Sequence, residues 1–181
     1  RGGIVGVNLG ANLDSEDRVS DYVTCLERLK DLAQFFTVNI SSPNTPGLRN
    51  LQSHGALDEL LAAVAQVRGQ APVFLKIAPD IADEDVSPII DAIARHGLDG
   101  IIVSNTTIQR PDSLSSEHMG EGGGLSGAPI FEPSTELVRQ FRRAAGPDLA
   151  IIGVGGIDSA DTAYAKIRAG ANAIQLYTGL V

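Results

Sequence analysis

The sequence has no tryptophan, and it has only one cysteine and one methionine in 181 residues. The single Cys25 cannot form an internal disulfide, and no cluster of Cys and His has the spacing of a zinc site. Basic residues are also few, with 14 Lys and Arg against 22 Asp and Glu. The sequence therefore excludes a disulfide framework and a structural zinc. Its net charge of −8 and its few aromatic side chains argue against binding to nucleic acid.

Long apolar runs are absent as well. No segment approaches the roughly 20 consecutive apolar residues that cross a membrane. The N-terminal Arg1-Gly2-Gly3 has no initiator Met and is not part of a signal peptide. We therefore expect an intracellular chain without a membrane segment, which begins downstream of the start of its gene. Its length fits one domain over residues 1–181.

Six short apolar runs rich in β-branched residues recur along the chain. They are continuous rather than alternating, which is typical of strands buried on both faces of a parallel sheet. The runs are residues 4–7, 36–40, 73–77, 100–103, 150–154 and 173–176. The amphipathic stretches between them predict helices over 15–33, 55–68, 83–95, 134–145 and 159–168. Asp83, Ser134 and Ser159 are expected helix caps, and several helices end on glycine.

A doubly wound sheet and a (β/α)8 barrel both fit this order of elements. Polar and Gly-rich residues follow the carboxyl ends of all six strands. A barrel builds its site from every such loop, whereas a doubly wound sheet uses mainly its switch point. We therefore predict an α/β fold, a (β/α)8 TIM barrel that is incomplete. About six of eight strands are present, and the N-terminal strands and the final helix are missing.

The densest polar motif spans residues 39–47, Asn-Ile-Ser-Ser-Pro-Asn-Thr-Pro-Gly, after the second strand. Its two prolines force the chain to turn, which leaves hydroxyls and carboxamides at the edge of the sheet. A self-capped turn would explain the same residues. A serine nucleophile needs a basic partner, and none of the three histidines lies in a suitable motif. If Ser42 is catalytic, we expect it to move a proton rather than to attack a carbonyl.

Lys76 ends the third strand, at the last inward position expected for a barrel. A lysine there needs a partner, which is either an anionic or electron-accepting ligand or a carbonyl substrate held as a Schiff base. The segment Ser104-Asn105-Thr106-Thr107 follows the fourth strand. Its hydroxyls and amide suit a small polar molecule, although a turn rich in Ser and Thr is an equal reading.

Two glycine-rich segments complete the pattern. The loop at residues 153–159 follows the fifth strand and enters a helix, a placement that suits a phosphate group. Barrels commonly bind phosphate after their last two strands, and Tyr177-Thr178-Gly179 ends the next strand here. The run at 120–127 lies in a connection of more than 20 residues, which either covers a cofactor or is a mobile solvent loop.

Taken together, seven motifs resemble dihydroorotate dehydrogenase, and specifically its class 2, quinone-dependent branch. The motifs are Val-Asn8-Leu-Gly, Asn39-Ile-Ser-Ser42-Pro-Asn44-Thr, Leu-Lys76-Ile-Ala-Pro-Asp, Ser104-Asn105-Thr106-Thr, Gly-Gly-Leu-Ser-Gly127, Ile-Gly-Val-Gly155-Gly156 and Gln-Leu-Tyr177-Thr178. The resemblance implies a barrel that holds FMN over the carboxyl ends of its strands. It also implies oxidation of (S)-dihydroorotate to orotate in pyrimidine biosynthesis, with a quinone as electron acceptor.

The resemblance implies roles for particular residues. Ser42 is similar to the class 2 base that removes the C5 proton, a position where class 1 enzymes have Cys. The residues similar to substrate-binding residues are Asn39, Asn44, Asn105 and Thr106. The residues similar to FMN contacts are Asn8, Asn39, Lys76, Ser104, Gly127, Gly155, Gly156, Tyr177 and Thr178. The loop from Ser42 to Gln52 resembles the active-site lid, and no metal is implied.

Family members also have N-terminal barrel strands, and class 2 enzymes have a helical extension that meets the inner membrane and admits quinone. We expect the chain alone to be inactive and to bind FMN weakly or not at all. Two alternatives stay open. One is another FMN barrel oxidoreductase, against which Ser42 argues. The other is a redox-silent phosphate-binding barrel, of the aldolase or isomerase type, with a Schiff base at Lys76.

Overall fold

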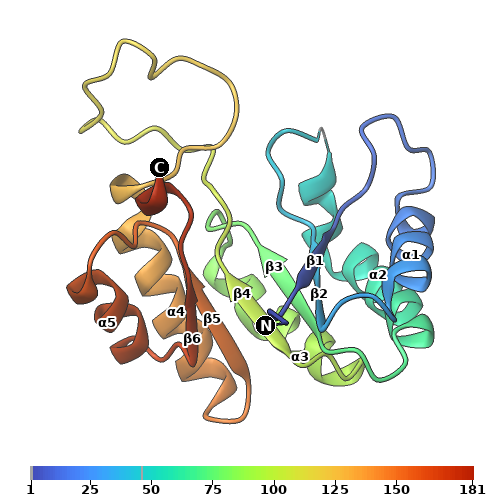
Figure 1. Cartoon of the computed structure of the whole chain (residues 1–181). Coiled ribbons are helices and arrows are strands. Elements are labelled where there is room, and N and C mark those ends of the chain that lie inside the picture. Colours follow the sequence, from blue (N-terminus) through green and yellow to red (C-terminus); the bar gives the residue numbers. More distant parts are fainter. Residues whose placement is uncertain (1, 46) are drawn as a thin grey trace.

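The computed structural model describes residues 2–45 and 47–181, so Arg1 and Pro46 of the motifs above lie outside the described residues. Six parallel strands form one sheet in chain order (Figure 1). They are β1 (Gly6–Leu9), β2 (Phe35–Asn39), β3 (Val73–Ile77), β4 (Gly100–Val103), β5 (Ala150–Val154) and β6 (Ala173–Gln175). The helices between them are α1 (Arg18–Leu29), α2 (His54–Val67), α3 (Val86–Arg95), α4 (Phe131–Ala145) and α5 (Ala160–Arg168).

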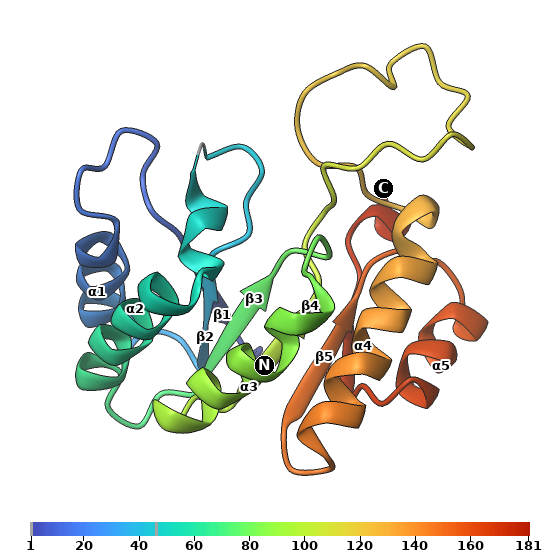
Figure 2. The same cartoon turned by 180° about the vertical axis from the view of Figure 1, so that it is seen from behind.

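All five helices lie on the same side of the sheet, as the two opposite views show (Figures 1 and 2). The first and last strands, β1 and β6, form the edges of the described sheet. Each strand pairs with the next one along the chain in parallel register. This arrangement confirms the prediction of an incomplete (β/α)8 barrel.

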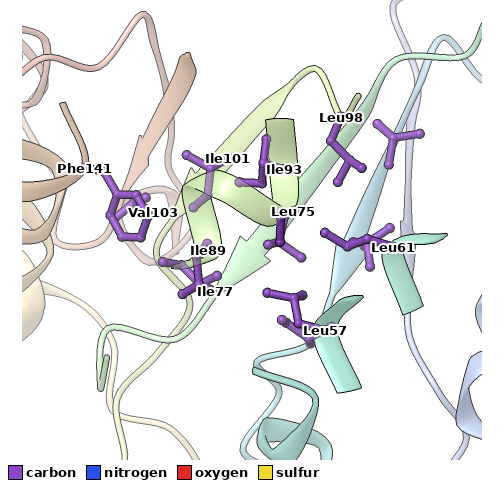
Figure 3. Close-up of a cluster of buried hydrophobic side chains, with 14 of the residues drawn as sticks. Leu57, Leu61, Leu75, Ile77, Ile89, Ile93, Leu98, Ile101, Val103 and Phe141 are labelled. Atoms are coloured by element: carbon purple, nitrogen blue, oxygen red, sulfur yellow. The ribbon is translucent and has the colours of Figure 1, made fainter. Parts of the chain in front are cut away.

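The hydrophobic core lies between the sheet and the helices. Alternate residues of each strand face the helices, and in β3 these are the fully buried Val73, Leu75 and Ile77. Leu57 and Leu61 of α2 pack against this face from one side (Figure 3). Each such side chain contributes about 1.5–3 kcal/mol when it is fully buried. The opposite face of β3 carries Phe74 and Lys76, which are half-buried.

Three of the expected helix starts are wrong. Helix α1 begins at Arg18 after its cap Asp17, rather than at residue 15. Helix α4 begins at Phe131, after a 3-10 turn over Ala128–Ile130 that contains Pro129. Ser134 is therefore a buried residue of the first turn rather than a cap, and its hydroxyl donates to the Ile130 carbonyl at 2.6 Å. Asp83 begins a separate 3-10 turn and does not cap α3. Proline is favoured at the start of a helix, and Pro129 accordingly lies in the turn that leads into α4, upstream of Ser134.

Other helix ends follow the sequence prediction. Ser159 caps α5 and forms a reciprocal capping box with Thr162. Gly97 and Gly146 follow α3 and α4 with positive φ angles, which glycine adopts without a steric penalty. None of the described helices is long and apolar enough to cross a membrane.

Candidate cofactor and substrate site

A cavity of about 430 Å³ lies at the carboxyl ends of strands β3 to β6. This volume is within the usual range of small-molecule pockets, roughly 300–1,000 Å³. The predicted site residues that line it are Lys76, Ser104, Asn105, Thr106, Gly127, Gly155, Gly156, Tyr177 and Thr178. Their positions agree with the general rule that barrels place their sites at this rim.

A hydrogen-bond network orients two of the predicted substrate amides. The Asn105 side-chain amide donates to Asn39 Oδ1 at 3.2 Å and to Ser41 Oγ at 3.1 Å. Ser41 is fully buried, and its hydroxyl lies 2.9 Å from Asn39 Oδ1. Behind the network, the buried Tyr22 hydroxyl donates to the Asn39 carbonyl at 2.7 Å. Both asparagines are therefore held in place by protein groups, and Ser41 and Tyr22 are site residues that the sequence prediction missed.

Lys76 lies beside this network because β2 and β3 align Asn39 with Lys76. Its side chain is half-buried and lines the cavity. Burial lowers the pKa of the Lys76 ammonium, since desolvation penalises its charged form. No ion pair to Lys76 occurs among the residues that the structure describes. The site thus presents an amine that an anionic or electron-rich ligand could stabilise in its charged form.

The glycine loop, Gly155-Gly156, forms another wall of the cavity. The two residues have φ angles of 108° and 70°, so side chains would be strained at both positions. A Cβ on Gly156 would also lie only 2.5 Å from Phe131 Cβ and 2.7 Å from Phe131 Cα. The loop therefore packs closely on the start of α4, and the N-terminal end of α5 follows it. This is the placement that favours an anion such as phosphate.

The segment around Gly127 closes the cavity near β6. Gly127 has a φ angle of 78°, and a Cβ there would lie 3.4 Å from Thr178 Cγ2. The Thr178 hydroxyl lies 3.1 Å from the Ser126 hydroxyl. The end of the long connection after β4 is thus joined to the end of the sheet at β6.

The same connection also returns to the middle of the rim. Its outer part extends away from the barrel as the yellow loop in Figure 1. A Cβ on Gly124 would lie 1.8 Å from Thr106 Oγ1, and one on Gly123 would lie 3.4 Å from Asn44 Oδ1. The glycines of the 120–127 run therefore permit close approach to two predicted substrate residues. Of the two interpretations of that run, this placement favours a segment that covers a ligand over a mobile solvent loop.

Four predicted residues lie outside the lining of the cavity, and one of them is Asn39 of the network above. Ser42 is half-buried and its hydroxyl accepts a long hydrogen bond of 3.3 Å from the Asn44 backbone N–H. Asn44 itself is exposed. Asn8 is exposed on the edge strand β1, where it is aligned with Thr37. All four residues belong to the β1 and β2 side of the rim.

A second cluster, which the sequence prediction missed, joins three loops of the rim. The Arg49 guanidinium donates to Asp80 Oδ2 at 2.5 Å, to the Thr106 carbonyl at 2.9 Å and to the Ser41 carbonyl at 3.3 Å. The Thr107 hydroxyl donates to the other oxygen of Asp80. Arg49 lies in the expected lid, so its side chain ties the lid to the loops after β3 and β4.

Fold and site together define a (β/α)-barrel protein with a small-molecule site at the carboxyl ends of its strands. The chain belongs to the dihydroorotate dehydrogenase family, because the model of that family matches residues 3–181.

Named relatives agree with this assignment. The chain is 56% identical over 189 residues to dihydroorotate dehydrogenase (quinone) from Brucella ovis, and equally to that from Brucella suis. These alignments cover 100% of this chain and 52% of each relative. The chain therefore spans about half the length of the curated relatives it matches.

Solved structures are similar as well. The ligand-free dihydroorotate dehydrogenase of Eimeria tenella has a TM-score of 0.94 and 38% identity, covering 99% of this chain and 55% of that chain. The complex of the Eimeria tenella enzyme with ferulenol has a TM-score of 0.91 and 39% identity, covering 98% and 53%.

Proposed function

We propose that this chain forms the FMN-binding and dihydroorotate-binding part of a quinone-dependent dihydroorotate dehydrogenase. Such an enzyme oxidises (S)-dihydroorotate to orotate in pyrimidine biosynthesis. The main observation in support is that Lys76, the glycine loop and the Asn39–Asn105 pair converge on one rim. The names of the relatives support the same reaction.

The chemistry of the donors at this rim fits FMN. Gly155 and Gly156 would hold the phosphate, with Ser104 and Thr178 as hydroxyl partners. Lys76 would provide positive charge beside the flavin ring, which stabilises negative charge that develops there. When bound, FMN supplies a two-electron acceptor for hydride. FMN contacts are also proposed for Asn8, Asn39, Gly127 and Tyr177.

Asn39, Asn44, Asn105 and Thr106 would bind dihydroorotate. Amides and hydroxyls suit a flat substrate that carries a carboxylate and ring amide groups. Because Ser41 and Asn105 already hold the Asn39 side chain, little side-chain entropy is lost when the substrate binds. The substrate-binding amides are thus organised in advance.

Ser42 would act as the catalytic base. Oxidation removes the C5 proton, which Ser42 accepts, and a hydride from C6, so that a C5–C6 double bond forms. A serine hydroxyl is a weak base, and the step therefore requires a closed site that excludes water. The loop from Ser42 to Gln52 is suited to closure, and Arg49 anchors its second half.

The two electrons would then pass to a quinone. Quinones that serve as respiratory carriers dissolve in membranes, so we propose a peripheral location on the inner membrane. A redox-silent barrel with a Schiff base at Lys76 is the competing function. Membership of the dihydroorotate dehydrogenase family favours the electrostatic role of Lys76 over the covalent one.

The decisive experiment grafts this chain into the Brucella ovis relative, in place of the segment that aligns with it. We expect a yellow protein whose flavin absorbance bleaches when dihydroorotate is added. The 181-residue chain alone should show no oxidation and weak flavin binding at most. A colourless graft would contradict the proposal, and borohydride trapping of substrate on Lys76 would favour the Schiff-base alternative.

Replacing Ser42 with alanine in the graft tests the catalytic role. The variant should retain its flavin but lose about 10²–10⁴-fold in the rate of bleaching, which is the usual contribution of a general base. Ser20→Ala is the matched control, since Ser20 is exposed on α1. Bleaching of the Ser42 variant at a near-normal rate would remove Ser42 from the mechanism.

A further inference from the structure

Lys166 of α5 is fully buried, which is rare for lysine. Its aliphatic stem passes over Gly153 of β5, where an added Cβ would lie 3.3 Å from Lys166 Cβ and 3.4 Å from its Cδ. A larger residue at position 153 would therefore crowd the stem. Gly153 provides room for Lys166, whereas the next two glycines of the segment line the cavity.

The Lys166 ammonium group ends at the first turn of α4. It donates to the Ser134 hydroxyl, lies 3.4 Å from the Phe131 carbonyl and lies 5.2 Å from the centre of the Phe131 ring. No ion pair to Lys166 occurs in the part of the chain that the structure describes. The charged groups that act on it are Glu132 and Arg139, both on α4, and β5 carries no charged residue.

Burial lowers the pKa of Lys166 to about 7, and the Glu132 carboxylate opposes this shift. Near neutral pH the Lys166 side-chain amine is therefore only partly protonated. Its contacts with Ser134 and Phe131 are strongest in the charged form, because hydrogen bonds from an ammonium are stronger than those from an amine.

Ser134 and Phe131, the two residues that the Lys166 ammonium group contacts, also pack against the glycine loop. An added Cβ on Gly155 would lie 2.8 Å from Ser134 Oγ, and one on Gly156 would lie 2.5 Å from Phe131 Cβ. Ser134 Oγ is also 3.3 Å from the Gly155 carbonyl. A shift in the first turn of α4 must therefore move the glycine loop, because close-packed groups transmit displacement.

We propose that Lys166 is a positioning residue of the anion site. Lys166 holds the first turn of α4 in place, and Gly155 and Gly156 pack against that turn. It acts through Ser134 and Phe131 rather than by contact with the ligand. The anion in question is the phosphate of FMN, and in that respect the inference rests on the proposed function. The positioning itself does not depend on FMN.

The first test uses the chain without a ligand. Its lysines are only Lys30, Lys76 and Lys166, so labelled lysine side chains give a simple NMR spectrum. We expect the amide signals of Gly155 and Gly156 to shift with pH along the titration of Lys166. Lys166→Met should abolish this pH dependence, and Lys30→Met, at an exposed position on the chain, should leave it intact.

A second variant guards against misfolding of Lys166→Met. Ser134→Ala keeps the lysine but removes the hydroxyl that accepts its hydrogen bond, so the titration of Lys166 should persist while the Gly155 amide, which lies beside Ser134, no longer follows it. Glycine amides that ignore the Lys166 titration in the unmodified chain would overturn the proposal without any variant.

The final test adds inorganic phosphate and, separately, FMN. Phosphate should shift the two glycine amides, and Lys166→Met should raise its apparent Kd about tenfold, with no change for Lys30→Met. Equal phosphate affinity in the Lys166 variant, or no phosphate binding at the loop, would overturn the role in an anion site. Because the chain alone is expected to bind FMN weakly at most, FMN is added to the graft, where phosphate binding without FMN binding would refute the proposed function and leave the assignment of Lys166 intact.

Discussion

Replacing Arg49 with methionine should loosen three loops of the rim together. Methionine keeps an unbranched apolar stem but removes the hydrogen bonds to Asp80, Thr106 and Ser41. The side chains of Arg49 and Asp80 are only 18% and 15% exposed, so the carboxylate loses its charged partner at a poorly solvated position and keeps only neutral donors such as the Thr107 hydroxyl.

The size of the effect follows from these contacts. Loss of one partner of a buried ion pair costs about 3–5 kcal/mol, and an exposed pair contributes at most about 1 kcal/mol. Because the Arg49–Asp80 pair is mostly but not fully buried, we expect the free energy of unfolding to fall by about 2–3 kcal/mol. Arg143→Met is the matched control, since Arg143 pairs with Glu136 at a side chain that is 65% exposed. Its loss should stay below about 0.5 kcal/mol.

Urea unfolding of the chain measures both variants, and the m-value shows whether unfolding stays two-state. Asp80→Asn and the double variant complete a mutant cycle, in which the pair should couple by at least about 1 kcal/mol. A loss below about 0.5 kcal/mol for Arg49→Met, or a coupling free energy near zero, would show that the cluster does not hold the loops together.

Three further predictions concern other parts of the site. Gly156→Ala should lower the free energy of unfolding, measured in urea, by about 2–4 kcal/mol. The added Cβ would clash with Phe131, and the backbone at this position has a positive φ. Gly10→Ala, where the added Cβ meets no atom within 4 Å, should be nearly neutral. Tyr22→Phe should cost about 1 kcal/mol in the same assay, because it leaves the Asn39 carbonyl without its buried donor, and an unchanged midpoint would contradict this. Lys166 has a pKa of about 7 when folded against an ordinary 10.5, so the unfolded chain binds more protons between these values. Lys166 should thus make stability rise from pH 7 toward pH 10 by at most about 1.4 kcal/mol per unit. Lys166→Met should remove this contribution and leave only the rise due to Lys76, whose pKa burial also lowers.

The sequence was enough to predict five of the six strands closely, because each lies on a short apolar run followed by polar residues. The exception is β1, which was expected at residues 4–7 but begins at Gly6 and includes Asn8. The helix start at Phe131 was not evident, since Ser134 resembles a cap and only its burial shows that it lies inside the helix. Most of the rim could be predicted as well. Parallel strands bring all their carboxyl ends to one edge, so Lys76 and Asn105 had to lie near each other.

The supporting residues could not be predicted in the same way. Arg49 reaches Asp80 across 31 positions and Thr106 across 57, and Lys166 reaches Ser134 across 32. None of these three contacts leaves a local pattern in the sequence, because each depends on which loops and helices become neighbours in space. A charged residue within an amphipathic helix, such as Lys166, looks like a solvated one until the packing of α4 on α5 is known.

The sheet has the same order in space as in the chain, so every strand pairs with its neighbour in sequence. Most contacts between elements consequently link one βα unit to the next. During synthesis on the ribosome, each βα unit can therefore dock on the preceding one as it emerges, and the layer of helices grows in step with the sheet.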